Sequence, residues 1–159
     1  MYLNFIFVSF LSIFSLSCNQ NVNYSNIFEL AENHRSNAEF MLCIKYLNQI
    51  INECKDYNLR QRAQFLIADI YMNDVKNYPY ALDEFRKVLS LKIDNNINKK
   101  SLFMYSYICS NYLDMYTDAY DSYKVFLELY PNDELVPSVL YEIDQLEPML
   151  ITAEKLINS

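Results

Sequence analysis

The chain has 159 residues, 52% of them hydrophobic, and it contains no glycine. This length supports one core of ordinary size, so we expect a single folded domain. The lack of glycine excludes glycine-rich phosphate-binding loops. The net charge of −7, with ten acidic residues against two lysines in residues 101–159, argues against nucleic acid as a partner.

The N-terminus contains an apolar run, residues 5–16, that ends just before Cys18 in the sequence "SLSC". The run is short for a membrane span and has the length of the central region of an export signal. With the small Ser17 before Cys18 and polar residues after it, the segment resembles a bacterial lipoprotein signal. The resemblance implies a signal peptide over 1–17, lipid modification of Cys18 and a polar tether over 18–24, and it implies membrane attachment through this lipid. Cleaved secretion and an uncleaved anchor are the two alternatives.

From residue 25 onward, the chain repeats a pair of helical stripes. The first stripe of each unit has a 3-1-3 spacing and comprises Ile27, Leu30, Ala31 and His34, then Gln64, Ile67, Ala68 and Tyr71, then Tyr105, Ile108, Cys109 and Tyr112. The second stripe has a 4-3 spacing and comprises Cys43, Leu47 and Ile50, then Ala81, Phe85 and Val88, then Ala119, Tyr123 and Phe126. Both spacings place their residues on one face of a helix. Each unit is therefore predicted to be two helices that approach closely at their small residues.

This pattern resembles the tetratricopeptide repeat (TPR), which has a bulky residue, Leu, a small residue and Tyr on its first helix, and Ala, Phe, Ala and Pro on its second. The resemblance covers residues 25 to about 131. A partial fourth unit would carry Val136, Val139, Leu140 and Ile143. The resemblance implies an all-α fold over residues 25–159: a right-handed superhelix of antiparallel helix pairs, with about three repeats and a partial fourth.

Capping and breaking signals predict helices at about 25–35, 37–54, 59–73, 78–91, 97–114, 117–130, 134–146 and 148–157. The sequence "SNAE", from Ser36 to Glu39, predicts a capping box, and Thr117 predicts another cap. Pro79 fits a first turn, whereas Pro131 and Pro148 are expected between helices. Without glycine, the left-handed turns at helix ends are expected to use asparagine, with four candidates: Asn73, Asn95, Asn96 and Asn132.

No catalytic or metal-binding constellation can be assembled from the sequence. His34 is the single histidine and occupies an aromatic position of the repeat, so we expect it to be packed and hydrogen-bonded. Cys43, Cys54 and Cys109 lack metal-ligand spacing, so we expect structural roles for them. The predictions are therefore no enzyme activity, no cofactor and no metal.

The stretch "ELYPNDELVPSVLYEI", together with the signal, is similar to periplasmic TPR lipoproteins of the outer-membrane barrel-assembly and Tol–Pal-associated type. The resemblance implies an exported, lipid-anchored scaffold in a bacterial cell envelope, at the outer membrane facing the periplasm. Its partners would be other envelope or outer-membrane assembly proteins. The alternative is a non-catalytic surface or periplasmic binding protein for cell-wall material or another envelope ligand.

If the pairs stack as in this family, the first helix of each unit lines the concave side. The face opposite the packing stripe mixes apolar and polar groups, which is typical of a peptide-binding surface. The predicted partner-binding residues are Arg62, Phe65, Asp69 and Met72 in the second unit, and Phe103, Ser106, Ser110 and Leu113 in the third. The alternative is that Phe65 and Phe103 pack against the next unit or the signal-proximal helix.

Overall fold

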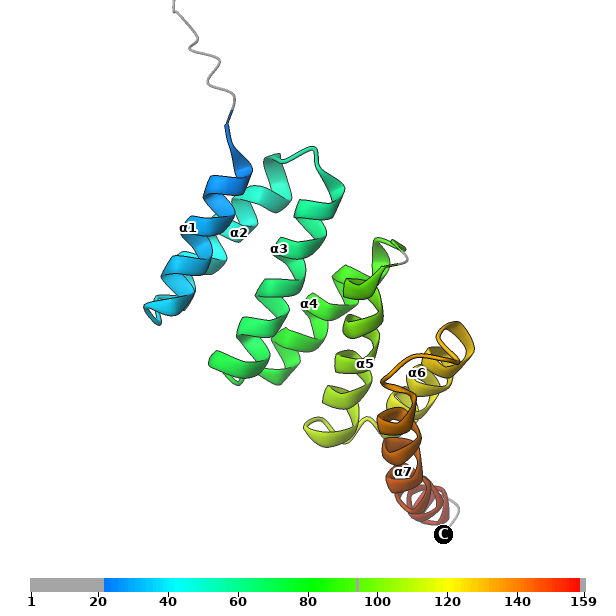
Figure 1. Ribbon diagram of the computed structural model, residues 1–159. Helices are drawn as coiled ribbons and strands as arrows, with labels where there is room; N and C mark the ends of the chain where they lie inside the picture. The colour runs from blue at the N-terminus through cyan, green and yellow to red at the C-terminus, as the bar shows by residue number, and fades with distance from the viewer. Residues whose placement is uncertain (1–21, 94, 158–159) are drawn as a thin grey trace, which may run out of the picture.

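A computed structural model describes residues 22–93 and 95–157 (Figure 1). The predicted signal peptide and Cys18 lie outside these residues. The described part is all-α, as predicted, and contains no strand. Its helices are α1 (Tyr24–Ser36), α2 (Phe40–Glu53), α3 (Tyr57–Asp69), α4 (Tyr78–Ser90), α5 (Asn96–Asn111), α6 (Tyr116–Leu129) and α7 (Val136–Ile157), and α3 runs into a π-helical turn, η1 (Ile70–Asp74).

The helices form three pairs in a row, α1 with α2, α3 with α4 and α5 with α6, followed by the single helix α7. Figure 1 shows α1 and α7 at opposite ends of this row, with α1, α3 and α5 nearer the viewer than their partners. Along the row, α3 contacts α5, and α5 contacts α7. The first helices of successive units thus adjoin one another, which is the arrangement expected of a TPR-like solenoid.

The small positions of the repeat are where the paired helices meet. Six residues at these positions are completely buried: Ala31, Cys43, Ala68, Ala81, Cys109 and Ala119. Large side chains of the second helices, such as Phe85, Tyr123 and Phe126, fill the space beside them and are also completely buried. The second stripe of each unit is therefore completely buried, as is the small position of the first stripe, whereas Leu30 and Tyr112 of the first stripes are exposed.

Two predicted helix caps were wrong. Helix α1 runs on through Ser36, whose hydroxyl donates a hydrogen bond to the carbonyl of Glu32 at 3.0 Å, so it caps no following helix. Thr117 lies inside α6, because that helix begins one residue earlier. The predicted place of Pro79 is confirmed, since it occupies the first turn of α4, where the missing N–H costs little.

Asparagine does not supply the left-handed turns in the described residues, contrary to the prediction. The residues with positive φ are Ala38, Lys76, Lys92 and Asp114, with φ between 52° and 60°, and each lies in a connection between helices. Asparagine caps helices instead. The side-chain oxygens of Asn23, Asn77 and Asn95 accept backbone N–H groups at the starts of α1, α4 and α5.

Helix α7 continues through Pro148, although the sequence predicted two helices there. A proline inside a helix removes one backbone hydrogen bond and clashes with the preceding turn. Packing on both sides of Pro148 opposes the break, because Leu146 is buried in the core and Leu150 is half-buried. In the described part of the chain, no helix has both the length and the apolar character needed to cross a membrane.

Candidate protein-binding surface

The exposed side of α3 carries the first set of predicted partner-binding residues. Arg62 is exposed, and its guanidinium lies 4.6 Å from the centre of the Phe28 ring in α1, a cation–π contact between the first two units. Phe65 is half-buried, with its ring edge-on to Phe85 of α4 at 5.7 Å. Arg62 thus makes an exposed contact between units and Phe65 packs within its own unit, and both still present part of their surface to solvent.

Asp69 and Met72 follow on the same side of α3 and η1. The Asp69 carboxylate accepts hydrogen bonds from the Arg35 guanidinium at 2.5 Å and from the Asn73 amide at 2.7 Å. Arg35 also binds Asp74 at 2.7 Å. Burial opposes the charge on Arg35, but the two carboxylates raise its pKa overall. Met72 was expected to be exposed and is only 9% exposed, because η1 turns it into the core.

The second predicted set lies on α5. Phe103 is half-buried and packs against Tyr107, Tyr123 and Phe126, with ring centres 6.1 to 6.4 Å apart. Ser106 was expected on the surface and is completely buried, with its hydroxyl satisfied by the Leu102 carbonyl at 2.9 Å. Ser110 and Leu113 are half-buried.

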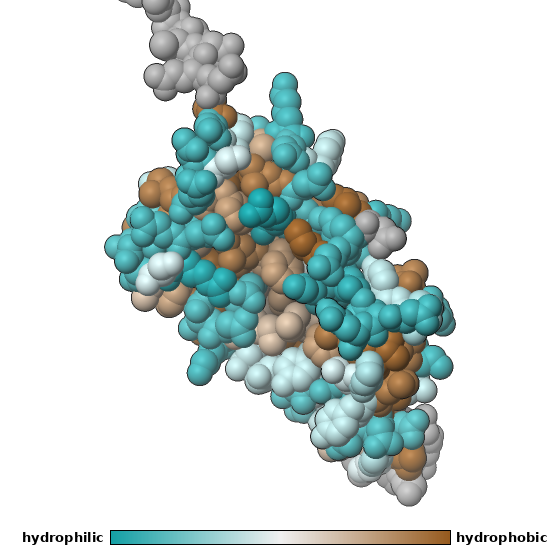
Figure 2. Space-filling model, in the orientation of Figure 1, coloured by the Kyte–Doolittle hydropathy of each residue, from teal (hydrophilic) through white to brown (hydrophobic). Residues whose placement is uncertain are grey.

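Six of the eight predicted residues therefore keep exposed surface, and Met72 and Ser106 do not. The rings of Phe65 and Phe103 pack against the second helix of their own units, where the alternative named the next unit or the signal-proximal helix. Figure 2 shows this side of the molecule, where hydrophilic side chains surround apolar ones visible between α1 and α3. The role of the eight residues in binding a partner stays a prediction.

The structure adds an aromatic row that the sequence analysis did not assign to this surface. Tyr107 stacks next to Phe103 and meets Tyr112 at 5.9 Å, and Tyr112 stacks on Tyr78 of α4 at 3.8 Å. Burial and the neighbouring Tyr112 raise the pKa of Tyr78. The available signal was the four-residue spacing of Phe103 and Tyr107, which places them side by side on a helix.

Close to this row, the amide of Asn111 donates to the Glu142 carboxylate of α7 at 3.1 Å. This contact joins the third unit to α7. Tyrosine rings with polar tips and nearby amide and carboxylate groups are typical of surfaces that bind proteins. The row therefore extends the candidate surface from α5 to the start of α4.

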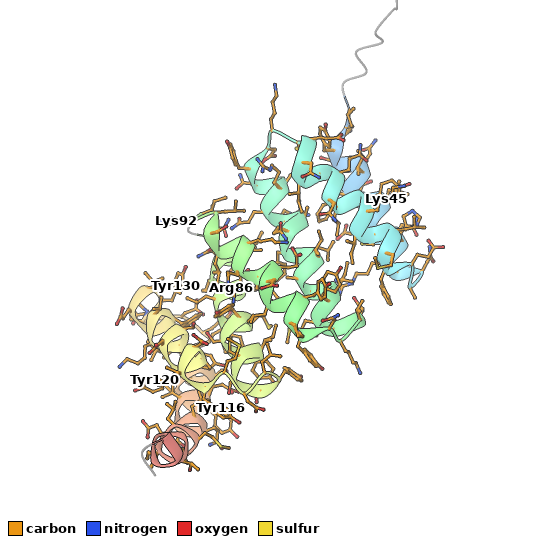
Figure 3. The ribbon with its side chains drawn as sticks, turned by 180° about the vertical axis from the view of Figure 1, so that it is seen from behind. Lys45, Arg86, Lys92, Tyr116, Tyr120 and Tyr130 are labelled. Carbon is orange, nitrogen blue, oxygen red and sulfur yellow. The ribbon has the colours of Figure 1, made fainter. Side chains whose placement is uncertain are left out.

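The opposite side of the molecule is seen in Figure 3, with Arg86 of α4 near its centre. A shallow pocket of about 390 Å³ lies along α4 beside Arg86. Its charges are paired within the helix, Asp83 with Arg86 at 2.6 Å and Glu84 with Lys87 at 2.7 Å. Such a paired, open surface offers a ligand little to bind.

His34 is packed and hydrogen-bonded, as predicted. His34 stacks on Tyr46 with ring centres 5.2 Å apart, and its Nδ1 lies 2.5 Å from the Glu39 carboxylate. The three described cysteines are buried and free, and burial raises the pKa of the Cys43 and Cys109 thiols to about 11. Among the described residues, no group of His, Cys, Asp and Glu could hold a metal ion.

Stacked helix pairs with small residues at their interfaces define a helical-repeat protein of TPR-like fold. No known protein-family model matches the chain, and no curated protein matches its sequence. Six chains of solved structures match it. One is the C-terminal TPR-containing domain of a Plasmodium falciparum FK506-binding protein, which is 22% identical with a TM-score of 0.56, the match covering 83% of this chain and 91% of that one. At this identity, the similarity establishes the fold alone.

Proposed function

We propose that the protein is a non-catalytic scaffold that holds a partner protein against the α3–α5 face. The observation that carries the proposal is the half-exposed aromatic row of this face, from Phe103 to Tyr78, flanked by polar groups. Aromatic side chains contribute a large share of binding energy at protein interfaces because they bury much area with few rotatable bonds. The TPR-like fold supports the proposal, since stacked repeats create extended binding surfaces.

We place this scaffold in a bacterial cell envelope, attached to the outer membrane through a lipid on Cys18 and facing the periplasm. The support is the apolar run that ends in "SLSC" and the similarity of "ELYPNDELVPSVLYEI" to envelope TPR lipoproteins. The partners would be proteins of outer-membrane assembly or envelope maintenance.

The anchor is tested by Cys18→Ser. This substitution removes the thiol that accepts the lipid, so the protein should leave the membrane fraction or remain unprocessed. The measurement is metabolic labelling with a fatty acid, followed by membrane fractionation. Equal labelling of the variant and the native chain would contradict the proposed anchor.

The binding face is tested by surface variants, because Phe65 and Phe103 also support the core. Arg62→Glu with Ser110→Glu changes the charge of the face without removing a core ring. Partner recovery from detergent-solubilised membranes should fall several-fold. The thermal midpoint should fall less than it does when both rings are lost, because the structural contact that is removed is the exposed one between Arg62 and Phe28. The control is Arg86→Glu, which makes the same arginine-to-glutamate change on the opposite side and should recover the partner as the native chain does.

The double variant Phe65→Ala with Phe103→Ala supplies a second arm. It should lower both binding and the thermal midpoint, because the rings contact Phe85 and Tyr123. If the folded fraction of this variant and the charge variant both recover the partner as well as the native chain does, the α3–α5 face does not bind the partner. Recovery of cell-wall material in place of a protein would favour the alternative ligand class.

A further inference from the structure

Helix α7 exposes a position that is buried in each of the preceding units. In the repeat register, Leu140 corresponds to Ala31, Ala68 and Cys109. Those three residues are completely buried where the first helix meets the second helix of its pair, whereas Leu140 is 52% exposed. Helix α7 packs on α5 and α6 through its other side, where Val139 is completely buried. The side that would receive a second helix is uncovered.

The exposed stripe continues along α7 with a defined chemical pattern. Asp144, Glu147 and Ile151 follow Leu140 at intervals of four, three and four residues, and all four side chains are exposed. This spacing keeps them on one face of the helix. The pattern is an apolar group at each end and two carboxylates between them, over roughly 16 Å at 1.5 Å per residue.

One end of the stripe opens into a shallow pocket between α6 and α7. Tyr120, Glu147, Leu150 and Ile151 line this pocket, whose volume is about 360 Å³. Figure 3, which views the molecule from behind, shows Tyr120 on α6 near α7. An apolar side chain of a docked helix has a place here, next to the Glu147 carboxylate.

The charge of this part of the chain selects the occupant. Residues 101–152 contain nine acidic residues and a single basic residue, Lys124. A second copy of the chain, paired through the same stripe, would bring four carboxylates together at the middle of the contact, which is unfavourable. A helix with lysine or arginine in the middle of its apolar stripe would place opposite charges there instead.

We infer that the Leu140–Ile151 face of α7 docks a cationic amphipathic helix of a partner protein, which completes the fourth helix pair. This inference rests on the proposed scaffold function and adds to it a second contact surface and the chemistry of the partner segment. The apolar residues of the docked helix pack on Leu140 and Ile151, and its basic residues bind Asp144 and Glu147.

The test uses two synthetic amphipathic helices that differ only at two central positions of the apolar stripe, lysine in one and glutamate in the other. Fluorescence anisotropy measures their binding to the purified chain at low and high salt. The lysine peptide should bind at least about tenfold more tightly, and more weakly as salt rises. In the variant Asp144→Lys with Glu147→Lys, the glutamate peptide should become the tighter ligand.

Two controls define the face. Asp121→Lys with Glu128→Lys changes the charge of exposed carboxylates on α6 by the same amount and should keep the native preference. Leu140→Ser should lower the affinity for the lysine peptide about tenfold, while the thermal midpoint measured by circular dichroism stays close to the native value. Where the charge-reversed variant fails to fold, Asp144→Asn with Glu147→Gln replaces it, and loss of the lysine preference is the expected result.

Equal binding of the two peptides to the native chain, or an unchanged preference after charge reversal, overturns the inference. The inference is also overturned if sedimentation shows that the native chain is a dimer and that Leu140→Ser makes it a monomer, because a second copy then covers this face of α7. Partner recovery with the membrane-anchored protein distinguishes an error in this inference from an error in the proposed scaffold function. If the charge-reversed variant recovers the partner undiminished, only the docking site on α7 is wrong. If the native chain recovers no protein, the proposed scaffold function is wrong.

Discussion

The guanidinium of Arg35, in the last turn of α1, lies 2.5 Å from the carboxylate of Asp69 in α3. Both side chains are about one quarter exposed, so the pair is less solvated than an ordinary surface ion pair. The turn η1 brings Asp74 to the same guanidinium. This ion pair joins the first two units, as the cation–π contact between Arg62 and Phe28 also does.

We predict that Asp69→Ala lowers the free energy of unfolding by about 1–2 kcal/mol, because Arg35 then keeps only one carboxylate in a partly buried site. The matched control is Asp83→Ala, which removes the partner of Arg86 on an exposed face and should cost no more than about 0.5 kcal/mol. Urea denaturation of the two variants measures the difference. Equal losses would show that the Arg35 contact adds nothing to stability.

Tyr123 is completely buried, and its hydroxyl has no hydrogen-bond partner among the described residues. We predict that Tyr123→Phe raises the free energy of unfolding by roughly 0.5–2 kcal/mol, because an unsatisfied polar group leaves the core and the ring remains. The control Tyr116→Phe removes a hydroxyl that donates to Asp114 at 2.7 Å and should bring no gain. A destabilised Tyr123→Phe protein would indicate a hydrogen bond that forms in solution.

Lys92 has a positive φ of 52° in the connection after α4. Residues with a Cβ are strained there, by about 1–2 kcal/mol, and glycine is not. We predict that Lys92→Gly is neutral or stabilising by up to about 1 kcal/mol after the greater flexibility of unfolded glycine is counted. Lys124→Gly, at an exposed lysine inside α6, should instead destabilise by about 0.5–1 kcal/mol. Thermal midpoints that fall equally would contradict the strain at Lys92.

The apolar periodicity predicted the fold well because it records which faces are buried. The small residues Ala31, Ala68 and Cys109 were assigned to helix–helix contacts from spacing alone, and all three are completely buried. Connections were predicted less well, because their geometry depends on the helices they join. Ser36 fits a cap by residue type, but α1 extends over it and Ala38 makes the turn.

The exposure of the eight candidate residues was predicted only in part, for a related reason. A helical face identifies which residues lie together, but it does not say how far the neighbouring helix covers them. Ser106 falls on the predicted open face of α5 and is completely buried, because its small side chain lies under its neighbours. The stacking of Tyr78 on Tyr112 joins residues from different units, and no local spacing indicates it.

Cys43 and Cys109 should resist thiol reagents in the native protein. Their pKa values lie near 11, above the ordinary value of 9.0, because burial disfavours the thiolate. The raised pKa means that the stability from keeping both thiols neutral is fully present below pH 9 and is lost as pH rises through about 11. A maleimide at pH 7.5 should label these cysteines only after denaturant is added, and rapid labelling of the folded protein would contradict their burial.

Helix α3 contributes buried residues to both hydrophobic clusters of the core. Ala63, Ile67 and Ile70, on α3 and its π-helical end, belong to the cluster formed with α1 and α2, whereas Ala68 and Met72 belong to the cluster formed with α4 to α7. The consequence is mechanical. When the two ends of the chain are pulled apart, neither cluster can open fully without loosening the helix on which the other is built. The array should therefore resist tension as one element, and a force–extension recording should show a single rupture in place of two.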